Sequence, residues 1–295
     1  SSLKKLGVKF EEEHGFLKCA VKNKLKGNKI TLSFPSVGAT ENVLLAAVTA
    51  KGQTIITNAA REPEIVDLAN FLISCGAKIK GAGSDNIYIE GVPELHECEH
   101  SVIPDRIAAT TFMSAVSITQ GEALIKKINP KHLWSILPIF EESGCKLSIY
   151  EDSVKIKNDN KLKSLSTIRT MPYPGFPTDV QAPIMAMSTV AQGTSIFVEN
   201  IFENRYKHVC ELNRLGAKIS VEGKVAIVYG VNNLSGAVTK CTDLRGGAAL
   251  VIAGLIAEGK TEILDIKHID RGYEKIENTL TNLGAQIERK KNTSN

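Results

Sequence analysis

The chain has 295 residues, of which 43% are hydrophobic and 23% charged, a composition typical of a globular protein long enough for two domains. Its 36 basic and 32 acidic residues are interleaved and give a net charge of +4. Nucleic-acid-binding proteins gather basic charge on one face and add stacking aromatics, but only 5% of this chain is aromatic, so no nucleic acid is expected as a partner. Since no apolar run reaches the ~20 residues that span a bilayer, and no apolar leader opens the sequence, we expect no membrane partner and a cytoplasmic location.

The first short pattern to recur along the chain joins the end of a helical segment to the start of a strand-like one. A glycine at this junction is the expected helix C-cap, because it enters the left-handed conformation without a steric penalty. The pattern occurs at residues 74–79, 143–147, 215–219 and 283–287.

A second set of glycines precedes these junctions with a spacing of roughly 70 residues. Each of them closes a helix of small and apolar residues and leads into a strand. The expected helices are Asn42–Ala50, Thr111–Ile118, Pro183–Ala191 and Ala248–Ala257. The sequence therefore predicts an α/β fold made of repeated βαβαββ-type units. Gly7 precedes Gly52 by the same 45 residues that separate Gly76 from Gly121, so we expect the chain to open at the end of a unit and to leave four complete units and a tail.

The loops that enter the helices carry most of the distinctive arginine and aspartate residues. If the units are pseudo-equivalent, these loops gather at one end of each lobe, and a cleft between lobes is where a ligand usually binds. Arginines beside helix N-termini favour a ligand that bears phosphate and carboxylate groups. The residues expected to converge are Arg106, Arg205, Arg245 and Arg271 with Asp105, Asp179 and Asp243.

Helix capping is the alternative explanation for several of these residues. An aspartate or serine at an N-cap stabilises a helix by ~1 kcal/mol and needs no ligand. Glu62 followed by Pro63 has the same simple explanation at a helix start. Asp179 is the candidate that capping explains least, because Phe176–Thr178 ahead of it favours a rigid loop that presents the carboxylate. The residues that capping explains are Ser36, Asp105, Asp243 and Asp270.

Metal and disulfide chemistry are not expected. None of the six cysteines lies in a CxxC pair or matches a zinc-site spacing, so we expect reduced thiols, no metal site and no cofactor.

Six motifs of the chain, taken together in order and spacing, resemble the UDP-N-acetylglucosamine 1-carboxyvinyltransferases. The shikimate-pathway enolpyruvyl transferases share the repeat architecture but not this motif set. The resemblance runs from the first residues to Lys290. The motifs are Ser36–Thr40, Asn58–Ile65, Phe176–Asp179, Phe202–Arg205, Thr242–Arg245 and His268–Glu274.

This resemblance implies the enolpyruvyl-transferase fold, an inside-out α/β barrel of two lobes. Residues 1–103 would be the remaining part of a first lobe that lacks its start, and residues 104–295 a nearly complete second lobe. The implied reaction transfers the enolpyruvyl group of phosphoenolpyruvate to the 3-hydroxyl of UDP-N-acetylglucosamine, the first committed step of peptidoglycan synthesis. Cell-wall biogenesis, cell shape and cell division would depend on it.

The resemblance also implies roles for individual residues. Asp179 would be the base that takes the proton of the sugar hydroxyl, and Arg245 and Arg271 would hold phosphoenolpyruvate. The residues implied to contact UDP-N-acetylglucosamine are Phe34, Pro35, Ser36, Val37, Asp179, Ile201 and Arg205. The supporting residues are Asp105, Arg106, Asp243 and Glu62.

The resemblance also implies that this chain lacks the N-terminal third of the family, which carries a general-acid cysteine loop and a lysine–asparagine pair. None of the six cysteines matches the family's general-acid cysteine loop, and its lysine–asparagine pair is not found. We therefore expect this chain to be inactive by itself. A non-catalytic binding or scaffold protein built from the same units is the alternative, whereas a nucleic-acid clamp would need a lysine-lined face that the scattered charges do not provide.

Overall fold

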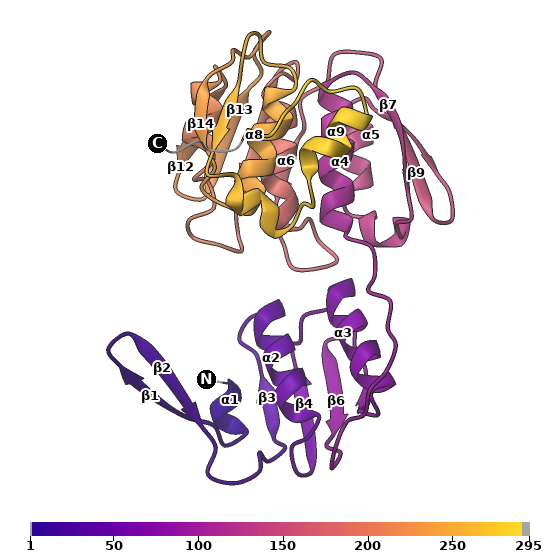
Figure 1. The fold of residues 1–295 in the computed structure, drawn as a ribbon, viewed down its shortest axis with the longest axis vertical. Helices are drawn as coiled ribbons and strands as arrows, with labels where there is room; N and C mark the ends of the chain where they lie inside the picture. The colour runs from indigo at the N-terminus through magenta and orange to yellow at the C-terminus, as the bar shows by residue number, and fades with distance from the viewer. Residues whose placement is uncertain (1, 291–295) are drawn as a thin grey trace. The chain divides into compact units, whose positions relative to one another are not determined.

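The computed structural model describes residues 2–290, which divide into two compact units (Figure 1). Within that range, unit 1 holds residues 2–103 and the short segment Pro172–Pro174, and unit 2 holds Pro104–Met171 and residues 175–290. No helix among residues 2–290 combines the length and apolar character needed to cross a bilayer.

Unit 1 is a mixed four-stranded sheet with two helices, preceded by a hairpin. The sheet has the strand order β3-β4-β6-β5, in which only β3 and β4 run parallel. Its elements are α1 (Ser2–Lys5), β1 (Lys9–Glu13), β2 (Phe16–Ala20), β3 (Lys29–Thr31), α2 (Val37–Ala47), β4 (Gln53–Thr57), α3 (Pro63–Ser74), β5 (Lys78–Lys80) and β6 (Asn86–Glu90).

The core of unit 1 lies between this sheet and the helices α2 and α3 (Figure 1). Strand β6 alternates exposed and buried residues, and Ile87 and Ile89 are both fully buried. Leu44 of α2 and Ile65 of α3 are equally buried. A period of two in the strand and an apolar stripe on each helix are thus sufficient to form this core.

Unit 2 repeats the same order of elements. Its sheets have the orders β7-β9-β8, β10-β11-β13-β12 and β14-β15. The helices are α4 (Arg106–Ile118), α5 (Leu137–Glu142), α6 (Thr178–Ser188), α7 (Val209–Arg214), α8 (Leu244–Gly254) and α9 (Ile276–Asn282), with 3-10 helices η1 (Pro130–Leu133) and η2 (Ile266–Arg271). The strands are β7 (Glu122–Lys126), β8 (Lys146–Ile149), β9 (Ser153–Lys157), β10 (Thr167–Arg169), β11 (Thr194–Val198), β12 (Lys218–Glu222), β13 (Val225–Tyr229), β14 (Val238–Lys240) and β15 (Glu262–Leu264).

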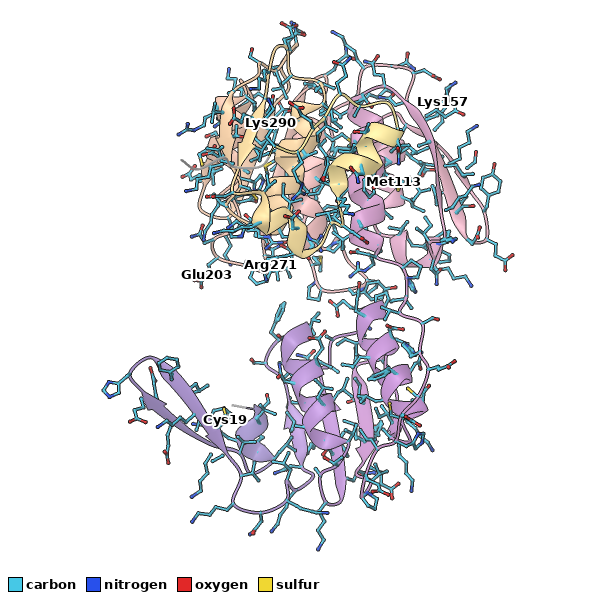
Figure 2. All side chains as sticks on the ribbon, in the orientation of Figure 1. Cys19, Met113, Lys157, Glu203, Arg271 and Lys290 are labelled. Atoms are coloured by element: carbon cyan, nitrogen blue, oxygen red, sulfur yellow. The ribbon has the colours of Figure 1, made fainter. Side chains whose placement is uncertain are left out.

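The helices α4, α6 and α8 lie side by side at the centre of unit 2, with its strands outside them (Figure 1). All three are buried around almost their whole circumference, and Met113 in the middle of α4 is fully buried (Figure 2). A helix without an exposed face belongs in a core. The predicted α/β fold of repeated units, with helices inside and sheets outside, is therefore confirmed, and the described strands form separate sheets with no closed barrel.

The four glycine-ended helices exist, but each begins four or five residues earlier than the sequence predicted. The loop signatures themselves start the helices, because Ser36, Asp105 and Asp243 accept hydrogen bonds from backbone N–H groups of the first turn. Pro183, expected at the start of its helix, lies inside α6. Asp179 consequently sits in the first turn of α6 and not in a rigid presenting loop.

The glycines at the predicted helix ends have the expected left-handed backbone. Gly76, Gly144, Gly216 and Gly284 have φ of +97°, +98°, +88° and +98°. The strand predicted after Gly284 is wrong for the described residues, since 285–290 form none. A strand needs a hydrogen-bonded neighbour, and no strand pairs with this segment.

Gly247 tests the close packing around α8. A Cβ at this position would lie 2.3 Å from Cys241 Sγ and 2.6 Å from Ile269 Cγ1, and both neighbours are buried. We expect Gly247→Ala to lower the free energy of unfolding by about 1–3 kcal/mol, measured by urea denaturation with circular dichroism. Gly38→Ala in α2 is the matched control, because its new Cβ meets nothing within 4 Å. An equal stability of the two variants would contradict this packing.

Candidate functional site

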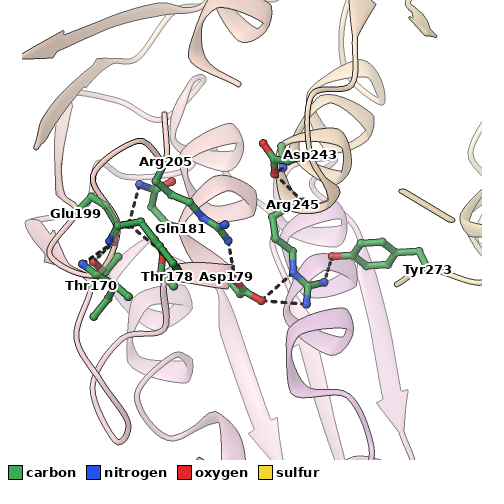
Figure 3. Close-up of polar contacts among 12 residues, drawn as sticks. Thr170, Thr178, Asp179, Gln181, Glu199, Arg205, Asp243, Arg245 and Tyr273 are labelled. Carbon is green, nitrogen blue, oxygen red and sulfur yellow. Dashed lines mark hydrogen bonds and ion pairs between the residues drawn. The ribbon is translucent and has the colours of Figure 1, made fainter. Parts of the chain in front are cut away.

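The Asp179 carboxylate is the centre of a polar cluster in unit 2 (Figure 3). Arg205 Nη2 donates to Oδ1 at 2.6 Å. Arg245 donates to Oδ2 through both Nε and Nη2, each at 3.2 Å. Three segments meet here: the first turn of α6, the loop after β11 and the first turn of α8. One carboxylate is thus held between two guanidinium groups.

The Asp179 carboxylate contacts two cations and remains partly open to solvent. Arg205 and Arg245 both bond to it, while its side chain is still 41% exposed. Guanidinium groups bind phosphate and carboxylate through paired N–H donors. The cluster is therefore suited to an anionic ligand that reaches Asp179 from solvent.

Arg245 is oriented by Tyr273 as well as by Asp179. Arg245 Nη1 donates to the Tyr273 hydroxyl at 3.1 Å, and the guanidinium carbon lies 5.6 Å from the ring centroid. Burial lowers the pKa of Arg245, but Tyr273 and Asp179 outweigh it and the pKa is raised, so the group stays charged. Burial raises the pKa of Tyr273, which stays a neutral phenol. Its hydroxyl also lies 2.8 Å from Thr111 Oγ1, and this contact ties α4 to the cluster.

The candidate aspartates beside Asp179 serve as helix caps. Asp105 accepts from the N–H groups of Ile107 and Ala108 at 2.7 and 2.9 Å. Asp243 accepts in the same way from Arg245 and Gly246, at 3.1 and 2.8 Å. These bonds satisfy the free N–H groups of α4 and α8, so the two aspartates fix the helix starts that carry the cluster.

Asp270 does not cap a helix, so that part of the capping prediction is wrong. It lies inside η2 and accepts two hydrogen bonds from Arg289, at 2.6 and 2.9 Å. Arg271 follows it at the end of η2 with an exposed side chain (Figure 2). Among the described contacts, none joins Arg271 to Asp179.

The remaining predicted site residues have no described hydrogen bond to Asp179. Arg106 is buried in the first turn of α4, and the half-buried Ile201 belongs to the loop that bears Arg205. The segment Phe34–Val37 belongs to unit 1, where Ser36 caps α2 and Phe34 is exposed. Glu62, also in unit 1, occupies the N-cap of α3 without a capping side-chain bond.

The sequence patterns did not single out Glu199. Glu199 is 1% exposed, and its carboxylate accepts hydrogen bonds from Thr170 Oγ1 and from Thr178 Oγ1, the residue before Asp179 (Figure 3). A charged residue at the end of the apolar strand Thr194–Val198 is the signal that could have revealed it, since buried charges need partners.

The thiols of the described residues take no part in the cluster. Cys241 lies two residues before Asp243, but burial raises its pKa to about 11 and its Sγ donates to the Asp243 carbonyl at 3.1 Å. Within residues 2–290, no group of three or more His, Cys, Asp or Glu side chains could hold a metal ion.

The model of the EPSP synthase (3-phosphoshikimate 1-carboxyvinyltransferase) family matches residues 1–280. The fold agrees with solved structures: the enolpyruvyl transferase NikO from Streptomyces tendae has a TM-score of 0.88 at 24% identity, with 97% of this chain and 71% of that chain covered. An EPSP synthase from Acinetobacter baumannii has a TM-score of 0.69 at 19% identity, covering 92% and 66%. The chain belongs to the enolpyruvyl transferases of this family.

Sequence relatives narrow the class. The chain is 55% identical over 285 residues to UDP-N-acetylglucosamine 1-carboxyvinyltransferase 1 of Caldanaerobacter subterraneus subsp. tengcongensis, with 97% of this chain and 68% of the relative covered. It is 54% identical over 286 residues to UDP-N-acetylglucosamine 1-carboxyvinyltransferase 2 of Carboxydothermus hydrogenoformans, covering 96% and 68%. Within the enolpyruvyl transferases, the chain is a member of the UDP-N-acetylglucosamine 1-carboxyvinyltransferases.

His208 makes the stability of unit 2 depend on pH. Burial lowers its pKa from 6.5 to about 4, and Nε2 has no hydrogen-bond partner among the described residues. The unfolded chain binds the His208 proton more tightly than the folded chain. The free energy of unfolding therefore keeps its full value above pH ~6.5 and falls by up to about 3 kcal/mol as the pH drops towards ~4. Urea denaturation of wild type and His208→Leu across this range should show a flatter dependence in the variant. Parallel curves would contradict the assignment.

Proposed function

We propose that the Asp179 cluster supplies the base and the anion-binding groups for enolpyruvyl transfer from phosphoenolpyruvate to the 3-hydroxyl of UDP-N-acetylglucosamine, and that this chain by itself lacks the general acid that completes the reaction. The observation that carries this proposal is a partly exposed carboxylate bracketed by two arginines at the start of a buried helix. It supplies a proton acceptor and anion-binding groups at one place. The names of the relatives at 54–55% identity support the choice of substrates.

Asp179 is the base in this proposal. It takes the proton of the sugar hydroxyl as the oxygen bonds to the central carbon of phosphoenolpyruvate, and the methylene carbon gains a proton from a general acid. The resulting intermediate carries the phosphate group. Loss of that phosphate, together with a proton from the new methyl carbon, gives the enolpyruvyl ether. A base must reach the hydroxyl within hydrogen-bond distance, and the exposed part of Asp179 is available for that contact.

The arginines bind the anionic substrate groups. Arg245 holds the phosphate or carboxylate of phosphoenolpyruvate together with Arg271, and both stabilise charge that develops in the intermediate. Arg205 and Ile201 contact the sugar nucleotide beside Asp179. Phe34, Pro35, Ser36 and Val37 contact its nucleotide part. Asp105 and Asp243 cap the helices α4 and α8. Arg106 and Glu62 are further supporting residues in this proposal.

The proposed reaction places the chain in peptidoglycan synthesis. Its product begins the conversion of UDP-N-acetylglucosamine into cell-wall precursor, so cell shape and cell division would depend on it. Both substrates are soluble metabolites of the cytoplasm, where we propose the protein acts.

Binding of the sugar nucleotide tests the proposal. We expect calorimetric titration of UDP-N-acetylglucosamine to saturate with the wild-type chain and to weaken ~10–100-fold in Asp179→Ala and in Arg205→Ala, because each change removes charge-assisted hydrogen bonds. Asp159→Ala is the matched control, since Asp159 is also 41% exposed and paired with two cations, Lys146 and Lys157. Equal affinities of the Asp179 and Asp159 variants would contradict the proposal.

Turnover tests the second part of the proposal, that this chain lacks a general acid. None of its six cysteines contacts Asp179, Arg205 or Arg245 among the described hydrogen bonds. We expect no phosphate release above background when the chain is mixed with both substrates, even where the sugar nucleotide binds. Catalytic phosphate release would contradict this expectation. The alternative, a non-catalytic binding or scaffold protein, is favoured if the folded chain binds neither substrate.

A further inference from the structure

Glu199 is a buried carboxylate directly after strand β11, and it accepts five hydrogen bonds. The donors to Oε1 are Thr170 Oγ1 at 2.9 Å, Ile201 N at 2.8 Å and Phe202 N at 3.1 Å. The donors to Oε2 are Thr178 Oγ1 at 3.0 Å and Gln181 Nε2 at 3.4 Å.

The two oxygens of Glu199 serve different segments (Figure 3). Oε1 holds the turn that leads to Arg205, through two of its backbone N–H groups. Oε2 holds the start of α6, through the hydroxyl of Thr178, which directly precedes Asp179. One rigid carboxylate therefore connects both members of the Asp179–Arg205 ion pair.

The turn held by Oε1 passes its position on to the Arg205 side chain. Phe202, whose N–H donates to Glu199, has its ring 5.3 Å from the Arg205 guanidinium carbon. Arg205 Nη2 then reaches Asp179 Oδ1 at 2.6 Å. A closed chain of contacts therefore runs from Glu199 Oε1 through Phe202 and Arg205 to Asp179, and from the adjacent Thr178 back to Glu199 Oε2.

A carboxylate is suited to this position, because it only accepts hydrogen bonds and every group that faces it donates. Gln181 turns its N–H₂ towards Glu199 and leaves its own Oε1 buried without a partner in the described chain. No described cation forms a salt bridge with Glu199, so these donors alone offset the cost of burying its charge. Burial and the Glu199 charge together raise the pKa of nearby Tyr206 to about 12.

We infer that Glu199 is a positioning residue, which acts through Thr178 and through the 201–205 turn to set the geometry of Asp179 and Arg205 for the proposed substrate. The inference rests on the proposed function and adds to it a residue that touches neither substrate. Its effect on substrate binding should therefore pass through Asp179 and through the 201–205 turn, which bears both Ile201 and Arg205.

The test separates the two halves of the connection. Thr178→Val removes only the hydroxyl that donates to Oε2, whereas Thr178→Ser keeps it, and Glu199→Ala removes both halves. We expect Thr178→Val and Glu199→Ala to weaken UDP-N-acetylglucosamine binding about tenfold in calorimetry, with Thr178→Ser restoring most of the affinity. Glu211→Gln is the control for a buried glutamate of unit 2: it accepts from Lys240 N at 2.9 Å, outside the cluster, and should bind as wild type.

A double-mutant cycle distinguishes positioning from general destabilisation. If Thr178 acts through Asp179, then Thr178→Val added to Asp179→Asn weakens binding no further than Asp179→Asn alone. Additive losses in the double variant would overturn the inference.

A second cycle needs no ligand. The coupling between Asp179 and Arg205 in urea unfolding should fall by half or more in the Thr178→Val background and persist in the Thr178→Ser background. Unchanged coupling in both backgrounds would overturn the inference. If the wild-type chain binds no sugar nucleotide, the proposed function fails while this unfolding cycle still decides the role of Glu199.

Discussion

Burial of α4, α6 and α8 on all sides is the constraint on which the rest of unit 2 depends. Three helices without an exposed face must pack closely against one another, and Gly247 leaves no space for even a methyl group. Their starts are therefore brought together. Arg245 of α8 bonds directly to Asp179 of α6 and is connected to Thr111 of α4 through Tyr273, because the helices share this core.

The same helix starts supply the chemistry of the site. Asp105 and Asp243 cap α4 and α8. Asp179, in the first turn of α6, instead bonds to Arg205 and Arg245. A carboxylate between two guanidiniums is held in one orientation, and the guanidinium N–H groups are suited to an anionic partner. Helix capping and the contacts to Arg205 and Arg245 are therefore made by different aspartates of the same repeated loop.

Burial of the Glu199 carboxylate costs stability, and the hydrogen bonds that offset this cost fix the segments that bear Asp179 and Arg205. A buried charge without a cation is expensive, and here five donors drawn from three segments offset that expense. The result is a single anchor for the start of α6 and for the turn that bears Arg205. Side chains held by such an anchor would lose less conformational freedom if a ligand bound to them.

The sequence by itself determined the repeat, the glycine helix ends, the caps at Ser36, Asp105 and Asp243, and the family to which the chain belongs, because these are local patterns read along the chain. Only the tertiary structure decided that the helices start at their loop signatures, that Arg205 and Arg245 rather than Arg271 contact Asp179, and that Glu199 lies beneath them. Which distant side chains meet depends on how buried helices pack. That packing is a property of the whole core, and no single segment encodes it.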